Sequence, residues 1–271
     1  MDAKLTLVYK TYKNDLPWIY YSLLSLKKFV SGPYYLILYC HNVCCDELMK
    51  LVRIVNIQCR IIPVHYNFHG YLKQMVVKAN CFNDVTTEYL AIVDSDIIFR
   101  KAFHVNELLN LTKKIQWKYW SNLPPTAEVT IWKEAFEKMT KTPQQVYYML
   151  NEFPFVFTTR SMLQASVKFI EMHGMDYETW CDQGCKKHNV QAHDSINGPN
   201  GRFNSMSKIF TEFEWLGFYC HHFSKDYTFV PTQASHHFSH SNKNISQNCI
   251  QFWSHGGLTP KIKSQIHQIL K

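Results

Sequence analysis

The sequence predicts an α/β fold, with a mostly parallel, doubly wound sheet flanked by helices and a mixed α+β half after it. Short apolar runs alternate with helix-period segments over the first hundred residues. The connections between these segments are short, as a sheet built from βαβ units allows. The chain has 271 residues, of which 46% are hydrophobic, which is enough to bury a substantial core.

The first hundred residues contain four strand-like segments, each short and rich in bulky apolar residues. We expect these strands at 5–9, 34–40, 59–66 and 89–93. Helical patterns follow the first three strands, and we expect these helices at 17–29, 46–55 and 71–83. Because parallel strands need crossover connections, the helices should cover the faces of the sheet.

The pattern is less regular after residue 100. We expect helices at 105–115, 142–150, 160–173, 207–223 and 259–270, and strands at 153–158 and 251–254. Thr142-Pro143 supplies an N-cap and a first-turn proline, and Gly174 supplies a C-cap. Residues 193–205 are rich in Asn, Gly and Ser, which predicts a long loop. We see no flexible linker, so residues 1–100 and 101–271 form two halves of one compact domain.

An Asp94-Ser95-Asp96 triplet follows the fourth strand directly. Ligands of open α/β sheets bind beyond the carboxyl ends of the strands. Two carboxylates at that edge can share Mn²⁺ or Mg²⁺, which in turn can hold a diphosphate. Turn-forming aspartates are the alternative interpretation. The position after a buried strand favours the metal site, with Asp96 the better direct ligand and Asp94 a second ligand or an acceptor for a ribose hydroxyl.

His255 is the histidine with the best context for a metal ligand, because it follows a short apolar strand and precedes two glycines. Glycines before a helix let backbone amides approach a diphosphate, and Lys261 in the first turn of that helix adds positive charge. The alternative is an ordinary glycine turn in front of a helix capped by Thr259.

Two further groups of polar residues are candidates for the ligand pocket. Thr11, Tyr12 and Lys13 follow the first strand at the same sheet edge, where Tyr12 can stack on a base. Gln74 and Lys78 share one face of the third helix at i and i+4. A surface pair is the default interpretation of these two. If the helix lines the cleft, Lys78 meets phosphate and Gln74 meets a sugar or base hydroxyl.

Residues 211–217 contain two glutamates with separable roles. Thr211 and Glu214 match a capping box, which gives Glu214 a structural explanation. Glu212 lies beside aromatic residues, where a half-buried carboxylate has the raised pKa that suits a general base. The alternative is that Glu212 is exposed in the first turn of a helix, where the macrodipole favours it.

A formal charge of +8 indicates an anionic partner, either nucleic acid, a membrane surface or a phosphorylated small substrate. Basic residues are scattered, which argues against nucleic acid; the densest runs are the doublets Lys27-Lys28, Lys113-Lys114 and Lys186-Lys187. The aromatic residues Trp117, Tyr119 and Trp120 lie close together and can stack on bases or sugar rings, although most aromatic residues belong to cores.

The composition predicts a cytoplasmic protein. We find no N-terminal signal and no run of about 18 apolar residues, so no transmembrane segment is expected. Nine cysteines without a small-domain spacing indicate reduced thiols.

The first half, ending in Tyr89-Leu-Ala-Ile-Val-Asp-Ser-Asp96, resembles the nucleotide-sugar half of a GT-A glycosyltransferase. Gln74-x-x-x-Lys78, Phe157-Thr-Thr159 and Thr211-Glu-Phe-Glu-Trp-Leu-Gly217 resemble a branch of that superfamily found in bacteria and in large DNA viruses of algae, which encode capsid-glycan enzymes. The similarity covers most of the chain in order. For a viral member, the compartment would be the host cytoplasm.

The resemblance implies a hexosyl- or pentosyltransferase that uses a nucleotide-sugar donor, such as a UDP-sugar, and a glycan acceptor. Residues 1–100 then bind the donor and residues 101–271 bind the acceptor. Asp94 and Asp96 match the positions that hold Mn²⁺ or Mg²⁺, Ser95 lies between them, and Glu212 matches the catalytic base of an inverting enzyme. His255-Gly-Gly257 with Lys261 is similar to a C-terminal metal-and-phosphate loop of some retaining members, whose remaining motif is absent here. The alternatives are a sugar nucleotidyltransferase and a non-catalytic glycan- or nucleic-acid-binding module.

Overall fold

The computed structural model describes most of the chain. The described residues are 3–65, 67–109, 114–121, 127–148, 154–191, 203–232, 243–244, 248–252 and 257–271. No helix within these ranges is both long and apolar enough to cross a membrane. All nine cysteines are free thiols.

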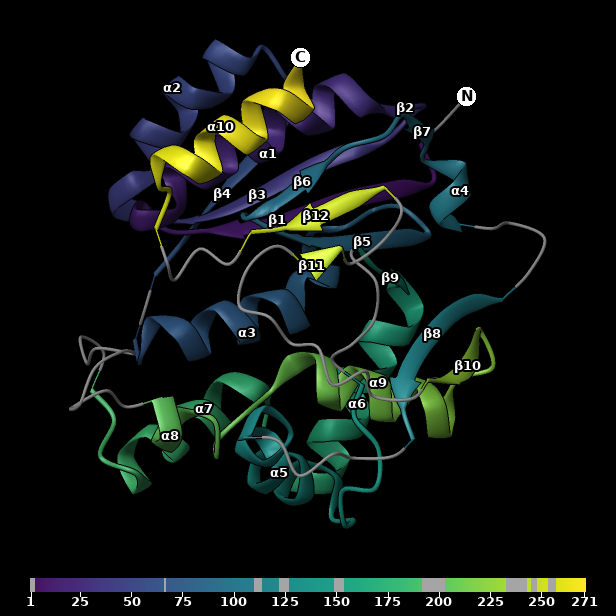
Figure 1. Cartoon of the computed structure of the whole chain (residues 1–271). Coiled ribbons are helices and arrows are strands. Elements are labelled where there is room, and N and C mark those ends of the chain that lie inside the picture. The colour runs from purple at the N-terminus through teal and green to yellow at the C-terminus, as the bar shows by residue number, and fades with distance from the viewer. Residues whose placement is uncertain are drawn as a thin grey trace.

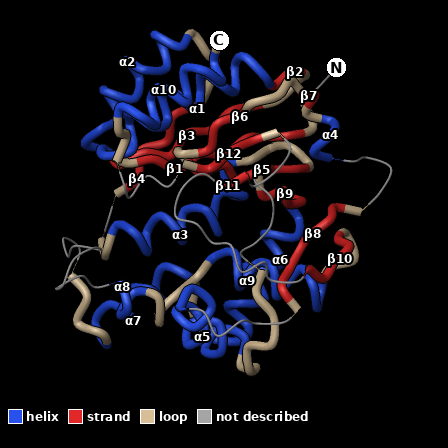
Figure 2. Tube along the Cα trace, in the orientation of Figure 1, coloured by secondary structure: helices blue, strands red, loops and turns tan. Residues whose placement is uncertain are grey.

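A five-stranded sheet forms the centre of the molecule, in the order β4-β3-β1-β5-β9 (Figures 1 and 2). Its strands are β1 (Leu5–Thr11), β3 (Tyr35–His41), β4 (Arg60–Val64), β5 (Tyr89–Asp94) and β9 (Phe155–Thr158). The first four strands are parallel, and β9 is antiparallel to β5. Every residue of β1 is buried, as expected for the central strand of a sheet covered on both faces. The predicted α/β fold with a mostly parallel sheet is confirmed.

Helices cover both faces of this sheet (Figure 1). One face carries α1 (Leu16–Phe29), α2 (Cys45–Val55) and α10 (Pro260–Leu270). The opposite face carries α3 (Gly70–Asn80), against which α6 (Thr159–His173) and α9 (Glu212–Phe223) pack. Helix α7 (Tyr177–Lys187) also packs against α3, and α5 (Ala127–Thr140) and α8 (Phe203–Met206) lie further from the sheet.

Short strand pairs extend the architecture. They are β2 (Val30–Ser31) with β7 (Phe103–His104), β8 (Ile115–Trp120) with β10 (Tyr227–Thr232), and β6 (Ile97–Phe99) with β12 (Cys249–Gln251), which also pairs with β11 (Lys243–Asn244). A single helical turn, α4 (Asn106–Leu109), lies between β7 and β8. The pairing of β12 with β6 brings the C-terminal region beside the loop that follows β5.

The sheet has a topological switch point at β1. This strand pairs with β3 on one side and with β5 on the other. The chain therefore adds β3 and β4 on one side of β1 and then crosses back to add β5 on the other side. Doubly wound sheets bind ligands in the crevice at such a point, beyond the carboxyl ends of the strands.

Several boundaries predicted for the second half are wrong. No helix starts at Thr142-Pro143; α5 ends just before it, where Lys141 has a left-handed φ of 57°, and Tyr147 instead bridges to Trp120. Of the helix expected at 105–115, the structure describes the turn α4, and Ile115 belongs to β8; residues 110–113 fall outside the described residues. The expected helix at 207–223 begins at Glu212, and the strand expected at 251–254 lies at 249–251. Most of the loop expected at 193–205 falls outside the described residues.

Helix α9 packs very closely against the segment that ends at Tyr148. A Cβ atom added at Gly217 would lie 2.4 Å from the Cβ of Tyr148, which cannot move without its backbone. A Cβ added at Gly184 of α7 would also lie 2.4 Å from its nearest atom, but this atom is the terminal Cγ2 of Ile209. Gly217 therefore allows a close approach that fixes the start of α9 against residues 144–148.

We expect Gly217→Ala to lower the free energy of unfolding by about 1–3 kcal/mol, the usual cost of overpacking, after the helix-propensity gain of alanine is included. Gly184→Ala makes the same chemical change with the same gain in propensity, and its nearest atom is a methyl group of Ile209 and not a Cβ that is bonded to the backbone. It should therefore lower the free energy of unfolding less than Gly217→Ala does. Urea unfolding of both variants checks the difference, and equal losses would contradict it.

Candidate active site

Polar and charged side chains gather where β1 and β5 end, at the switch point of the sheet. Lys10 and Asp94 are neighbours in the parallel register of these two strands. The Ser95 hydroxyl donates to the Lys10 carbonyl at 3.0 Å, which ties the loop after β5 to the end of β1. The sequence prediction that the Asp-Ser-Asp triplet follows a buried strand is confirmed.

The C-terminal region holds Asp96 in place. The backbone N–H of Phe252 donates to the Asp96 carbonyl at 3.0 Å, and Gln251 Nε2 lies 3.5 Å from Asp96 Oδ1. The Asp96 side chain is buried. Asp96 therefore does not behave as an exposed turn aspartate, and Gln251 is a neighbour that its sequence pattern did not single out.

Lys78 links the triplet to α9 through two buried ion pairs. Its Nζ lies 2.6 Å from Asp94 Oδ1 and 3.4 Å from Glu212 Oε1. Lys78 and Glu212 are each 3% exposed, so water screens the contact between them very little. Nζ also lies 5.2 Å from the centroid of the Phe213 ring. The structure thus brings together three residues that are far apart in the sequence, each predicted to belong to the site.

Burial and charge act in opposite directions on the pKa values of this cluster. Burial alone would lower the pKa of Lys78, but Asp94 and Glu212 outweigh it and raise the pKa. Burial raises the pKa of Glu212, and the Lys78 ammonium offsets part of that rise. Glu212 Oε2 is buried and has no hydrogen-bond partner among the residues that the structure describes. Such an unsatisfied carboxylate oxygen is costly, and it points to a ligand or a chemical role.

Glu214 has a structural role that differs from the predicted capping box. The side chain of Thr211 makes no capping hydrogen bond. Glu214 is fully buried, and its carboxylate accepts from the backbone N–H of Tyr148 at 2.8 Å and from Gln144 Nε2 at 3.3 Å. Glu214 thus anchors α9 to the segment that Gly217 contacts closely.

Asp15 is a member of the site that the sequence pattern did not reveal. It occupies the N-cap position of α1, but its side chain makes no capping hydrogen bond. Instead it is buried, hydrogen-bonded to Tyr12, and close enough to Asp94 to feel its charge. Burial and then Asp94 raise the pKa of Asp15 to about 7. The sequence Asp15-Leu-Pro17 looks like an ordinary helix start, which hid this role.

Lys10 and Thr11 are also buried beside the carboxylates. Burial lowers the pKa of Lys10 to about 8, and its Nζ donates to the Thr11 carbonyl. Within the described part of the chain, the buried Thr11 hydroxyl has no hydrogen-bond partner. Burial, followed by Asp15, raises the pKa of Tyr12 to about 12. The end of β1 therefore lies beside Asp15 and Asp94, and its role in the site stays a prediction; Lys13 is exposed.

Two candidates lie further from the carboxylates. Gln74 is half-buried one turn before Lys78. Lys261 is exposed in the first turn of α10, and α10 begins on the side of the sheet where β1 ends (Figure 1). His255 lies outside the described residues, as does Gly256.

Asp94 and Asp96 are the predicted metal ligands among the described residues. Within the described part of the chain, no three or more His, Cys, Asp or Glu side chains are grouped to hold a metal ion. Mg²⁺ sites in phosphate-binding enzymes commonly use one or two carboxylates together with substrate phosphates. Asp94 and Asp96 offer carboxylate oxygens of this kind at the edge of the sheet.

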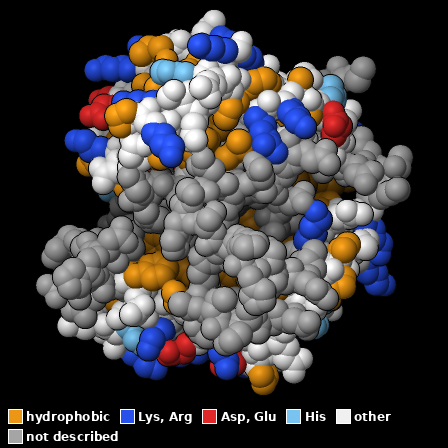
Figure 3. Space-filling model, in the orientation of Figure 1, with side chains coloured by type: hydrophobic (Ala, Val, Ile, Leu, Met, Phe, Trp, Pro, Cys, Tyr) orange, Lys and Arg blue, Asp and Glu red, His pale blue; other side chains and the backbone are white. Residues whose placement is uncertain are grey.

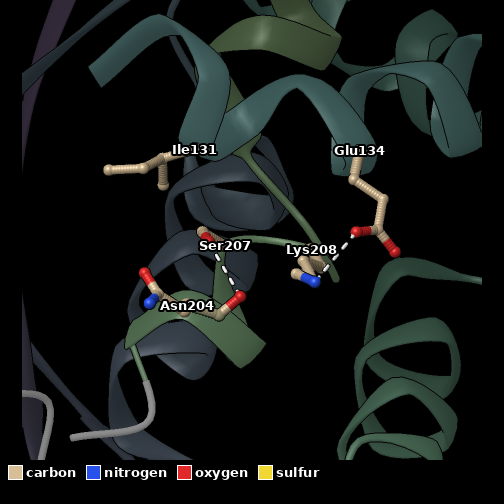
Figure 4. A pocket seen from close by; sticks show the side chains of 5 residues that line it. All are labelled: Ile131, Glu134, Asn204, Ser207 and Lys208. Atoms are coloured by element: carbon tan, nitrogen blue, oxygen red, sulfur yellow. Dashed lines mark hydrogen bonds and ion pairs between the residues drawn. The ribbon is translucent and has the colours of Figure 1, made fainter. Parts of the chain in front are cut away.

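A pocket elsewhere on the molecule contains no residue predicted for the site. It lies between α5 and α8 and is lined by Ile131, Glu134, Asn204, Ser207 and Lys208 (Figure 4). Lys208 Nζ and Glu134 Oε2 form an ion pair of 3.3 Å across it, and both side chains are partly exposed to solvent. The unsatisfied buried oxygens of Thr11 and Glu212 make the sheet edge the stronger candidate.

The chain belongs to the Family of unknown function (DUF6492), whose model matches residues 26–254. No curated protein matches the chain. The solved structures similar to it include S. aureus TarS (14% identity, TM-score 0.39), where the match covers 60% of this chain and 30% of TarS. They also include the apo form of mouse xyloside xylosyltransferase 1 (11% identity, TM-score 0.41), with 100% of this chain and 93% of that one covered. These TM-scores are too low to carry an argument.

The raised pKa of Asp15 predicts that stability falls as pH rises. The folded chain keeps the Asp15 proton up to about pH 7, whereas the unfolded chain loses it near the ordinary value of 3.8. The unfolded state thus binds fewer protons between these pH values, so the free energy of unfolding decreases with pH. Relative to wild type, Asp15→Asn should gain about 2–4 kcal/mol between pH 4 and pH 8.

Denaturant unfolding at several pH values measures this gain. Asp46→Asn is the matched control, because Asp46 is an exposed aspartate in the first turn of another helix, α2. The free energy of unfolding of Asp46→Asn, relative to wild type, should not show the gain between pH 4 and pH 8 that is expected for Asp15→Asn. If the free energy of unfolding of Asp15→Asn relative to wild type does not change with pH, the Asp15 carboxylate of the wild-type protein is already well solvated or paired.

Proposed function

We propose that this protein is a metal-dependent glycosyltransferase that moves one sugar from a nucleoside diphosphate donor, such as a UDP-sugar, to a hydroxyl of a glycan acceptor. The observation that carries the proposal is the buried cluster of Lys78, Asp94 and Glu212 next to Asp96 at the switch point of the sheet. It combines a cation for phosphate, two carboxylates for a metal ion and one carboxylate for proton transfer.

The donor lies in the crevice beyond β1 and β5 in this proposal. Tyr12 stacks on the base, and the unpartnered Thr11 hydroxyl bonds to its polar edge or to the ribose. Lys78 Nζ lies 2.6 Å from Asp94, so it is already held where phosphate oxygens of the donor would arrive. Asp94 and Asp96 would hold Mn²⁺ or Mg²⁺, which supplies positive charge to the departing diphosphate.

Glu212 acts as the general base in an inverting transfer. Its buried carboxylate has a raised pKa and a free Oε2 lone pair, both of which favour accepting a proton from the acceptor hydroxyl. Lys78 favours the ionised form of Glu212 before the transfer, because the ammonium opposes part of the effect of burial on the Glu212 pKa. Once Glu212 is protonated, Lys78 remains paired with Asp94.

Two alternatives have weaker support. A sugar nucleotidyltransferase would use a glycine-rich phosphate loop after β1, but residues 10–15 contain no glycine and form the short 3-10 helix η1 (Lys13–Asp15) instead. A glycan- or nucleic-acid-binding module would use exposed aromatic rings, but Trp117 and Trp120 are in the core. Lys and Arg side chains on the face in Figure 3 are also scattered over several elements.

Metal-dependent donor binding is tested through Asp96. We expect Asp96→Asn to weaken Mn²⁺-dependent UDP binding at least about tenfold, because one of two carboxylate ligands loses its charge. Isothermal titration calorimetry with UDP, with and without Mn²⁺, measures the effect. The exposed Asp46→Asn variant is the control and should bind like wild type. Unchanged Mn²⁺-dependent binding in Asp96→Asn would remove the triplet from the donor site.

The base is tested by comparing the two glutamates of α9. Glu212→Gln should preserve donor binding and lower kcat about 10²–10⁴-fold, the range for loss of a general base. Glu214→Gln makes the same change two residues away. It should lower the stability of the protein, since the Glu214 carboxylate accepts hydrogen bonds from Tyr148 and Gln144. Below its melting temperature, this variant should keep most of kcat. Steady-state kinetics with a competent acceptor, together with melting curves, separates the two effects. Similar losses of kcat in both variants would make Glu212 structural as well.

A further inference from the structure

Helix α6 is apolar on its outer side as well as on its inner side. The inner side packs into the core through Met162, Ala165 and Phe169. On the outer side, Leu163, Val167 and Ile170 keep 49%, 47% and 44% of their surface exposed. Their spacing of four and three residues places them in one row, which we call the α6 stripe. A helix with two apolar sides normally has a neighbour on each.

The end of α9 extends this stripe. Phe223 is 50% exposed, and the Lys168 Nζ of α6 lies 5.6 Å from the centroid of its ring. The other exposed large apolar residues belong to β3, α2 and the turn between them, and they form no comparable row; they are Tyr35, Val43, Met49 and Ile54. The α6 stripe is therefore the clearest apolar row on the surface of the described residues.

Charges of opposite sign flank the two ends of the stripe. Arg160 is exposed in the first turn of α6, and Glu171 is exposed in the last. About three helical turns separate them, so they lie on the same side of the helix. Glu171 pairs with Lys168 at 3.1 Å, but both side chains remain in contact with solvent, where such a pair contributes little.

We propose that the α6 stripe is the contact surface of a reversible two-fold dimer of this chain, with the two α6 helices antiparallel. A two-fold axis places the same patch on both sides of the contact, so the patch must complement itself. Antiparallel packing does this, because Arg160 of each copy meets Glu171 of the other while the apolar rows face each other. Parallel packing would place like charges together.

The charge pattern favours a second copy over a lipid surface. An anionic membrane would attract Arg160 and Lys168 but repel Glu171, which lies on the same side of the helix. The stripe is also short, with three apolar side chains of α6, whereas stable complexes bury roughly 800 Å² per partner. The dimer should therefore dissociate on dilution. This inference does not depend on the proposed activity, since no residue of the site takes part.

Sedimentation velocity of the full chain over about 1–300 µM tests the proposal, since this range brackets weak self-association. Wild type should change from monomer to dimer across the series. Val167→Lys should raise the dissociation constant at least about tenfold. Arg160→Glu and Glu171→Arg should each raise it several-fold, and the double reversal should restore it to near the wild-type value. Monomer throughout, or a double variant no better than the singles, overturns the proposal.

Ile54→Glu on α2 is the matched control, because Ile54 is 68% exposed and lies outside the stripe; it should dimerise like wild type. Circular dichroism melting confirms that each variant is folded. Flotation with vesicles that contain anionic lipid tests whether the stripe binds a membrane surface instead of a second copy of the chain. The proposal is overturned if the wild-type chain stays monomeric but binds these vesicles, and Val167→Lys abolishes that binding. The stripe would then contact a membrane and not a second copy of the chain.

Discussion

The candidate site depends on one buried cation shared by two carboxylates. Lys78 comes from α3, Asp94 from the end of β5 and Glu212 from the start of α9, so a single ammonium group joins the sheet, the helix beneath it and a helix of the second half. Two carboxylates without that cation would face each other in a medium that screens poorly, and one of them would then take up a proton. If the proposed function is correct, binding and architecture are coupled, because a phosphate group that paired with Lys78 would change what holds α9.

The supporting contacts around this cluster are ordinary packing and hydrogen bonds. Glu214 accepts from the backbone of Tyr148, and Gly217 lets the same residue approach α9 without a side chain between them. These contacts fix the first turns of α9, where Glu212 lies. Two chemically identical side chains two positions apart thus have different tasks: one carboxylate is satisfied on both oxygens, and the other retains an oxygen without a partner.

The first half of the chain could be predicted closely from its sequence, because buried parallel strands are short, continuous apolar runs. Lys78 was recognised by its helical spacing and Asp94 by its position after a buried strand. Their ion pair was not predicted, since contacts between distant segments leave no local pattern. Asp15 was missed for a related reason: Asp-Leu-Pro has the chemistry of a helix start, and only the fold turns that carboxylate inward. The helix expected after Thr142-Pro143 failed because Tyr147 pairs with Trp120, a tertiary contact that outweighs capping preference.

The bond between Phe252 and Asp96 has a consequence for how the protein acquires its site. These residues are separated by more than half the chain, and β12 pairs with β6 right beside them. During synthesis the N-terminal strands emerge early and can pair, since they need only one another. The loop that carries Asp96 acquires this support only after residue 252 has left the ribosome. A nascent or C-terminally trimmed chain would hence have the sheet but lack the Phe252 hydrogen bond that supports Asp96. Ligand binding at this site would then wait until the C-terminal region has been synthesised.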